Sequence, residues 1–146
     1  MTKPRKEDEP GVVGQITLDL STGEVTLSDM MQRYKTRIAG VTYSNEDGAD
    51  RQDLIVQCKP GDEVVLVREP DNPHDSAAIA VYWKGHQIGY VPTGDRRLAL
   101  HMDAGYGVFA HIVGIHGGPT WLDRILGRKR SYGCVIEIAK DYKKKG

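Results

Sequence analysis

One short segment of the chain concentrates side chains that bind ligands or react. Residues 68–92 read REPDNPHDSAAIAVYWKGHQIGYVP, and a proline-containing turn near their start separates two apolar runs. The turn supplies carboxylates, an amide and an imidazole, from Glu69, Asp71, Asn72, His74 and Asp75. Asn72-Pro73 is a strong turn signal and aspartates cap backbone amides, so one interpretation is purely structural. The other is a polar binding pocket at the bend.

Catalytic and metal-binding chemistry has less support. Acids beside a histidine at a bend are a possible site for a divalent cation in phosphodiester hydrolysis, the cluster here being Glu69, Asp71, His74 and Asp75. No nucleophile elbow, P-loop, HExxH or helicase motif is present. Cys58 and Cys134 lie far apart without a CxxC partner, so we interpret them as small core residues. The prediction is a binding protein, not an enzyme, with no metal and no cofactor.

Composition predicts one soluble domain. The chain has 146 residues, 39% of them hydrophobic, and no apolar run long enough to cross a bilayer. The first residues, MTKPRKEDEPG, lack the apolar region of a secretory signal, so we expect a cytoplasmic protein without a membrane partner. Formal net charge is zero, which gives no global electrostatic case for nucleic acid. Basic residues nevertheless gather at 127–130 and in the last seven positions.

The chain divides into four predicted parts. Residues 1–11 are polar and expected to be disordered. Residues 12–36 form a hairpin or extension, because apolar residues alternate on both sides of a Ser21-Thr22-Gly23 turn. Residues 37–140 form the main domain, and 141–146 a basic tail.

The main domain is predicted to be mainly β with minor α. Alternating apolar residues and turn signals predict strands over 37–43, 63–69, 77–83, 86–91, 107–115 and 132–140. One main helix follows the fourth strand, in TGDRRLALHMDAGY, and a shorter amphipathic piece is PTWLDRILG. Five or six short strands with a helix after the fourth favour a small, bent barrel of the oligonucleotide-binding type.

These residues carry a family resemblance. The motif AGVTY, then REPDNPHDSAAIAVYWKGHQIGYVP, then a helix ending in DAGY resembles the HIRAN domain over roughly Arg37 to Lys140. The resemblance implies a modified oligonucleotide-binding barrel that captures the 3′ end of single-stranded DNA. It also implies an aromatic-lined pocket in which an acid meets the terminal hydroxyl. By position, Asp75 matches that acid, Asn72 matches the second asparagine of the motif and Tyr43 matches a first-strand aromatic.

Other positions depart from the eukaryotic motif. Asp71 replaces an asparagine and His74 a tyrosine, while Thr42, Tyr90 and Thr93 stand in place of basic residues. Cationic phosphate contacts are therefore fewer here, which favours an alternative function: a protein-interaction or regulatory module that keeps the barrel and has lost DNA-end binding.

Physical chemistry selects the candidate contacts. A buried carboxylate accepts a hydrogen bond from a terminal hydroxyl and repels a phosphate, a role that suits Asp75 or Asp71. The residues predicted to bind the DNA end are Tyr43, Asp71, Asn72, His74, Asp75, Tyr90 and Trp121. The candidate phosphate contacts are Arg51, Arg68, Arg96, Arg97, Arg128, Lys129 and Arg130. Trp83 we assign to the core, because it shares strand parity with Ile79 and Val81. The predicted partners are a single-stranded DNA 3′ end and a DNA-processing or remodelling enzyme on a separate chain.

Overall fold

Seven antiparallel strands form one sheet in the computed structural model, which describes residues 11–19, 21, 24–93 and 96–144. The strands are β1 (Gly11–Asp19), β2 (Glu24–Arg37), β3 (Glu63–Arg68), β4 (Ile79–Trp83), β5 (His86–Tyr90), β6 (Tyr106–Gly117) and β7 (Tyr132–Lys144). Their order across the sheet is β1-β2-β7-β6-β3-β4-β5. The fold is mainly β, as predicted.

β1 and β2 form a hairpin at the N-terminal side of the sheet, and its second strand runs past residue 36. β1 and β2 pair in a register that sets Ile16 opposite Leu27 and Leu18 opposite Val25. β2 then pairs with β7 as far as Arg37, so it runs across the predicted boundary between residues 36 and 37. Residues 1–10 and two of the predicted turn residues, 22 and 23, lie outside the described part of the chain.

The strand predicted over 37–43 is wrong beyond its first residue. β2 ends at Arg37, and Gly40 has a φ of +68°, a left-handed conformation that interrupts an extended strand. A single bridge remains, in which Ala39 and Tyr90 exchange N–H···O hydrogen bonds of 2.7 and 2.9 Å. The curved sheet is therefore not closed by continuous pairing, but this bridge joins β5 to the segment that follows β2.

The core lies inside the curve of the sheet. Alternation along β7 buries Cys134, Ile136 and Ile138 completely. Trp83 is buried as predicted, and its indole N–H donates to Asp62 at 3.0 Å. Both cysteines are buried and free. Burial raises the pKa of the Cys58 thiol to about 11, so it is a neutral core group.

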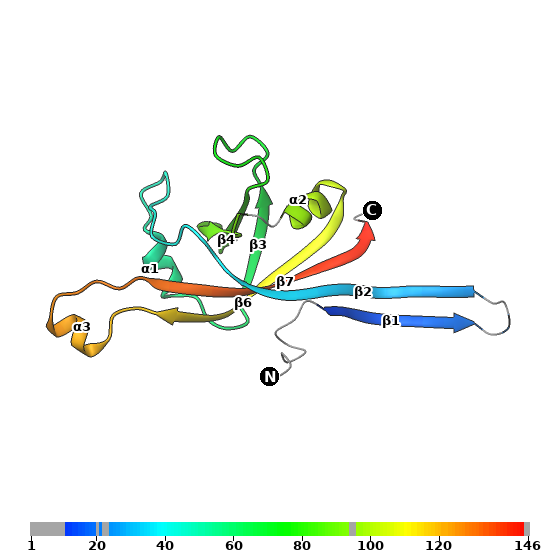
Figure 1. Ribbon diagram of the computed structural model, residues 1–146, viewed down its shortest axis with the longest axis horizontal. Coiled ribbons are helices and arrows are strands. Elements are labelled where there is room, and N and C mark those ends of the chain that lie inside the picture. The colour runs from blue at the N-terminus through cyan, green and yellow to red at the C-terminus, as the bar shows by residue number, and fades with distance from the viewer. Residues whose placement is uncertain (1–10, 20, 22–23, 94–95, 145–146) are drawn as a thin grey trace, which may run out of the picture.

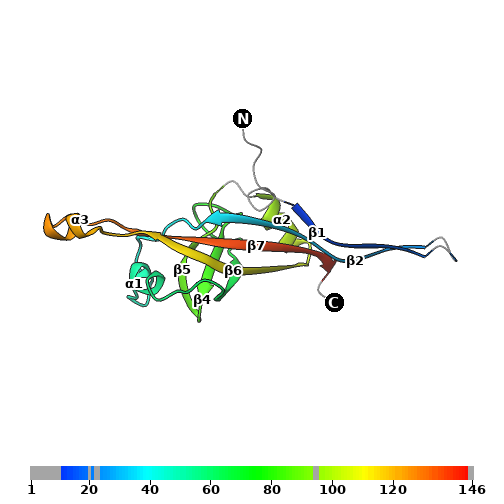
Figure 2. The same ribbon diagram turned by 90° about the horizontal axis from the view of Figure 1, so that it is seen from below.

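Three short helices flank the sheet: α1 (Arg51–Ile55), α2 (Arg96–Asp103) and α3 (Trp121–Ile125). The sequence predicted α2 and α3 but not α1, which begins where the Asp50 side chain accepts the N–H of Gln52. Figures 1 and 2 show α3 and the β1–β2 hairpin at opposite ends of the long axis. None of the helices in the described residues is long and apolar enough to cross a membrane.

β7 extends further than predicted at its C-terminal end. The predicted strand stops at residue 140, whereas β7 continues to Lys144 and pairs with both β2 and β6. Residues 141–144 of the predicted tail are therefore part of the sheet. The side-chain pattern did not indicate this, because Asp141 and Tyr142 are followed only by lysines and a glycine.

Candidate nucleic-acid interface

The connection between β3 and β4, residues 69–78, separates two hollows of the surface. The larger is a cleft of about 800 Å³ and the smaller a pocket of about 240 Å³. Asn72, His74 and Tyr90 line both. We call residues 69–78 the turn, and the two hollows the cleft and the pocket.

The turn is held by its own side chains. Oδ1 of Asn72 accepts the backbone N–H groups of His74 and Asp75 at 2.9 and 3.1 Å. Oδ1 of Asp75 accepts the N–H of Ala77 at 2.9 Å. These are the local hydrogen bonds that asparagine and aspartate favour in turns. The structural role weighed for these residues is therefore present, and it leaves one oxygen of Asp75 without such a bond.

Tyr90 stands between the two hollows, linked to the start of the turn. Its hydroxyl donates to Oε1 of Glu69 at 2.9 Å, and the same oxygen accepts the Asn72 amide at 3.0 Å. Burial is the main reason why the pKa of the Tyr90 phenol is raised, so the hydroxyl stays a neutral donor. The Arg51 guanidinium lies 5.6 Å from the centre of the Tyr90 ring.

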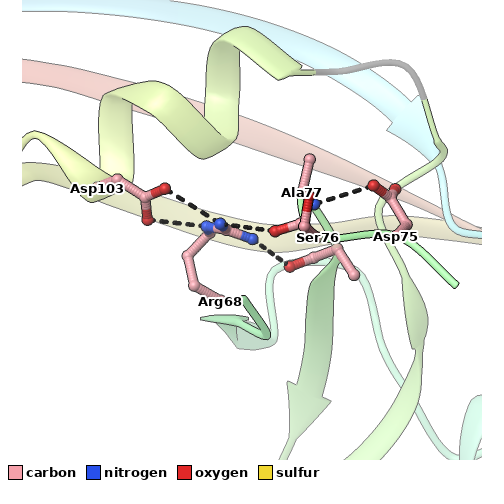
Figure 3. A network of polar contacts seen from close by, with 6 residues as sticks. Arg68, Asp75, Ser76, Ala77 and Asp103 are labelled. Carbon is pink, nitrogen blue, oxygen red and sulfur yellow. Dashed lines mark hydrogen bonds and ion pairs between the residues drawn. The ribbon is translucent and has the colours of Figure 1, made fainter. Parts of the chain in front are cut away.

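Arg68 fastens the end of the turn to α2. Its guanidinium donates to both carboxylate oxygens of Asp103, at 2.9 and 3.0 Å, and to the carbonyls of Ser76 and Ala78, at 2.9 and 2.7 Å (Figure 3). The hydrogen bond to Arg68 lowers the pKa of Asp103 and keeps it ionised. The Arg68 side chain, predicted as a phosphate contact, therefore bonds protein groups and stabilises the fold.

Arg51 has a similar structural role. Its side chain is buried at the start of α1, and it donates to Oδ1 of Asn45 and to the carbonyl of Gly40, both at 2.8 Å. The cleft also contains four carboxylates, from Glu46, Asp47, Glu69 and Asp71. Carboxylates therefore outnumber guanidinium groups in it by two, and the cleft is acidic.

The pocket differs from the cleft in chemistry. Its walls include Ala39, Gly40, Ala78 and Val91, and its polar groups come mainly from the turn. Asp75 lines the pocket and not the cleft. The Asp75 carboxylate, one oxygen of which forms no hydrogen bond within the turn, therefore borders an apolar space that His74 and Tyr90 also line.

The remaining predicted residues do not line either hollow. Tyr43 is exposed beside Gly40, and Arg96 and Arg97 are exposed at the start of α2. Trp121 begins α3 at the far end of the molecule, followed by Arg128, Lys129 and Arg130 (Figure 1). The structure therefore groups Arg51, Arg68, Asp71, Asn72, His74, Asp75 and Tyr90 and separates them from the others.

Sequence reasoning missed the second wall of the cleft. Asn45 accepts from Arg51 and donates to the carbonyl of Gln87 at 2.8 Å, which ties the loop before α1 to β5. Glu46 and Asp47 follow it on the cleft surface. The signal was the segment SNEDGAD, residues 44–50, whose asparagine, aspartates and glycine are typical of a polar turn.

The described residues do not form a metal centre. No group of three or more His, Cys, Asp or Glu side chains among them is arranged to hold an ion, and this includes Glu69, Asp71, His74 and Asp75.

Comparison with known proteins places the chain in a family. The sequence matches the HIRAN domain family over residues 31–127, and the chain belongs to that family. The HIRAN domain is a nucleic-acid-binding module and not a catalytic one. No curated protein is similar enough in sequence to count as a relative.

Two solved structures resemble the fold. The HIRAN domain of human HLTF is 18% identical, with 74% of each chain covered and a TM-score of 0.50. A protein from Lactobacillus plantarum is 19% identical, with 71% of this chain and 90% of that one covered and a TM-score of 0.49. The likeness to the human domain extends to the fold and supports the predicted oligonucleotide-binding type of architecture.

Proposed function

We propose that the chain binds single-stranded DNA and holds its 3′-hydroxyl end at the turn. The observation that carries this proposal is the carboxylate of Asp75, which borders the apolar pocket with one oxygen not used by the turn. A carboxylate in this position accepts the hydrogen bond of a terminal hydroxyl and repels a terminal phosphate.

The walls of the pocket suit an unstacked terminal nucleoside. His74 and Tyr90 offer flat rings, and base stacking on such side chains contributes about 1–3 kcal/mol per base. Ala78 and Val91 supply apolar contacts for the base or the sugar. The acidic cleft on the other side of the turn disfavours phosphates, so the strand leaves the pocket in another direction.

The proposed role is binding alone. The chemistry is then supplied by a DNA-processing or repair enzyme on a separate chain. The two unpaired, buried thiols are consistent with a reducing compartment such as the cytoplasm.

The test is a fluorescence-anisotropy titration with one short strand that carries either a 3′-hydroxyl or a 3′-phosphate. We expect the native chain to prefer the hydroxyl end by at least about tenfold, which is the effect of one charge repulsion of about 1.4 kcal/mol. Asp75→Asn keeps the acceptor for Ala77 and removes the charge, so it should lose most of this preference and keep its stability.

A matched control lies on the same turn. Asp71→Asn makes the same chemical change, but its side chain lines the cleft and not the pocket. It should leave most of the preference intact. Equal affinity of the native chain for both ends rules out the proposal.

A second candidate function follows from the charge of the cleft. Its excess of carboxylates favours a cationic partner such as a lysine-rich or arginine-rich peptide. This is the protein-interaction alternative, and it predicts binding of a basic peptide that Asp71→Asn weakens and Asp75→Asn does not.

A further inference from the structure

The connection between β6 and β7 forms a small projecting unit, residues 118–131, which we call the knob. It begins where Gly118 donates its N–H to the carbonyl of Ser131 at 3.1 Å, and it contains α3. Figures 1 and 2 both show it at one extreme of the long axis, beyond the ends of the strands. The knob is far from the β1–β2 hairpin and on the side of the molecule that carries α1.

Asp123 holds the knob together from inside. Its Oδ2 accepts the N–H and the hydroxyl of Thr120, at 3.0 and 2.9 Å, and pairs with Arg130 at 2.9 Å. The Asp123 N–H donates in return to the Thr120 hydroxyl, which completes a capping box. The knob thus has a defined shape that its own hydrogen bonds and ion pair stabilise.

The outer surface of the knob is apolar at its centre. Four large side chains are exposed: Trp121 by 72%, Leu122 by 45%, Ile125 by 70% and Leu126 by 53%. Single exposed apolar residues are ordinary, but these four come from α3 and its C-cap Leu126 at spacings of one and four residues, which places them on one side of the helix. An exposed apolar patch of this kind marks a binding surface.

The rim of the patch is basic. Arg124, Arg128 and Lys129 are exposed, and none of them forms an ion pair with a described carboxylate. Arg130 is paired with Asp123. The knob therefore carries a net positive charge, whereas the cleft is negative.

The knob and the turn are connected through α1. Arg51 lies in the cleft, and the next residue, Gln52, holds the base of the knob by bonding the N–H and carbonyl of Tyr132 at 2.7 and 3.0 Å. From Tyr132 the chain leads into the knob, whose two ends are joined by the hydrogen bond from Gly118 to Ser131.

We infer that the knob is a second nucleic-acid contact, which binds the single strand that leads to the 3′ end. Arg124, Arg128 and Lys129 neutralise phosphates, and Trp121 stacks on a base while its apolar neighbours cover the sugar and base edges. This inference rests on the proposed function. It assigns selection of the end to the pocket and most of the phosphate-dependent affinity to the knob.

The observations favour a nucleic acid over a lipid bilayer. An apolar surface confined to one helix of five residues is much smaller than the amphipathic helices that anchor proteins to membranes. The family is one of nucleic-acid-binding modules, and the cleft has no uncommitted cation for phosphates, because Arg51 and Arg68 bond protein groups. The phosphate contacts must then come from elsewhere, and the knob has the required charge.

The experiment compares 3′-hydroxyl strands of about 4 and about 12 nucleotides, labelled at the 5′ end, by fluorescence anisotropy over a range of salt concentrations. The native chain should bind the longer strand at least about tenfold more tightly. Its slope of log affinity against log salt should be steeper by about 2, since each phosphate contributes about 0.7 on a single strand. The longer strand should also quench the fluorescence of the exposed Trp121, and the shorter one should not.

Two sets of substitutions isolate the knob. Combined Arg124→Gln, Arg128→Gln and Lys129→Gln should remove the dependence on length and the extra slope, and leave the preference for a 3′-hydroxyl unchanged. Trp121→Ala should weaken only the longer strand, by about tenfold. The matched control replaces Lys35, Arg37 and Lys59, which are exposed elsewhere, with glutamine, and it should retain the dependence on length.

The outcomes separate this inference from the proposed function. Suppose that the native chain binds 3′-hydroxyl and 3′-phosphate strands equally, and that the knob variants lose the dependence on strand length. The knob contact then stands and the pocket proposal fails. If the dependence on length persists in the knob variants, the inference is overturned. Two other results also overturn it. In the first, the knob substitutions abolish binding to anionic phospholipid vesicles and leave binding of the longer strand unchanged. In the second, they abolish self-association of the chain and again leave binding of the longer strand unchanged.

Discussion

The turn and the knob are both connections between strands, but they are held in different ways. Besides the local hydrogen bonds of Asn72 and Asp75, the turn depends on residues distant in the chain, since Arg68 reaches Asp103 in α2 and Tyr90 in β5 reaches Glu69. Asp123 holds the knob through Thr120 and Arg130, which are close in sequence. The shape of the binding pocket is therefore a property of the whole fold, whereas the shape of the knob is a local property.

The two regions also differ in charge. Carboxylates are in excess around the cleft, and unpaired cations surround the apolar patch of the knob. The formal net charge of the chain is zero because opposite local charges cancel. Net charge alone therefore does not describe the electrostatic field near either region, since charges separated by more than about 8 Å are largely screened in physiological salt.

The largest expected effect is on the turn. Arg68→Ala removes a bidentate ion pair and two hydrogen bonds to carbonyls, so the free energy of unfolding should fall by roughly 2–3 kcal/mol. Urea denaturation measures this loss. The preference for a 3′-hydroxyl over a 3′-phosphate end should fall as well. The steeper salt dependence of the longer strand, which is assigned to the knob, should remain.

The control for Arg68 is another arginine in an ion pair. Arg33 pairs with Glu137 at 3.4 Å and is more exposed, so Arg33→Ala should cost less than about 1 kcal/mol. Equal destabilisation by the two substitutions contradicts the role assigned to Arg68.

A smaller effect is expected at the base of the knob. Gly118 has a φ of +82°, and a Cβ there would overlap the ring of Tyr132, so Gly118→Ala should destabilise by about 2 kcal/mol. Gly127→Ala is the matched control, because Gly127 has a φ of +69° and no atom lies near the added methyl group. This variant should lower the free energy of unfolding by about 1 kcal/mol. Binding of a 12-nucleotide strand should weaken more in the first variant. An equal effect on the hydroxyl-end preference would show that the turn and the knob are not independent.

The end of β7 tests whether either region depends on the rest of the sheet. Deleting residues 141–146 removes the pairing of Asp141 with Met31 and the hydrogen bond from the Tyr142 hydroxyl to Gln32 at 3.2 Å. The unfolding free energy should fall by about 1–2 kcal/mol, because cross-strand contacts contribute up to about 1 kcal/mol each. The sequence predicted only a basic tail here, and a tail outside the sheet would contribute none of this stability.

Thermal unfolding measures the effect of this deletion. A shorter deletion of residues 145 and 146 is the control and should leave the midpoint unchanged. The preference for a hydroxyl end should persist in both truncated chains. Its loss would show that the pocket depends on the far end of β7.

The sequence predicted most of the fold because the necessary signals are local. Alternation along β4 and β7, the positions of α2 and α3, and the burial of Trp83 all follow from spacing of two or of three to four residues. The exceptions also have local physical causes. The left-handed Gly40 ended a strand that its neighbours favoured, and α1 is too short to show a helical period.

The candidate site was only partly predictable. The turn was recognisable because its polar residues are adjacent in sequence, and in the structure they line both hollows. The partners of its arginines were not predictable, since Asp103 lies 35 positions from Arg68. Trp121 and the 128–130 cluster were assigned to the same site as the turn, and the structure separates them, because sequence patterns do not show distances between loops.

The smallest expected effect concerns the acid at the centre of the knob. The hydrogen bonds from Thr120 and the charge of Arg130 lower the pKa of Asp123 below its usual value near 4. An acid with a lowered pKa in the folded state contributes stability above its unfolded pKa and loses it as the pH falls through the folded value. The knob should therefore loosen below about pH 4.

Hydrogen exchange of individual amides measures this loosening. The N–H of Arg128 bonds the carbonyl of Asp123 at 2.8 Å, so its protection should decrease between pH 5 and pH 3 after correction for intrinsic exchange. In Asp123→Asn no proton is bound in this range, and the protection of Arg128 should become independent of pH. Asp103 in α2 also has a lowered pKa, so the amides of α2 are a second probe. Loss of protection there that is the same in the native chain and in Asp123→Asn measures acid destabilisation outside the knob. A pH dependence at Arg128 that is the same in the native chain and in Asp123→Asn would mean that the knob is not held by this carboxylate.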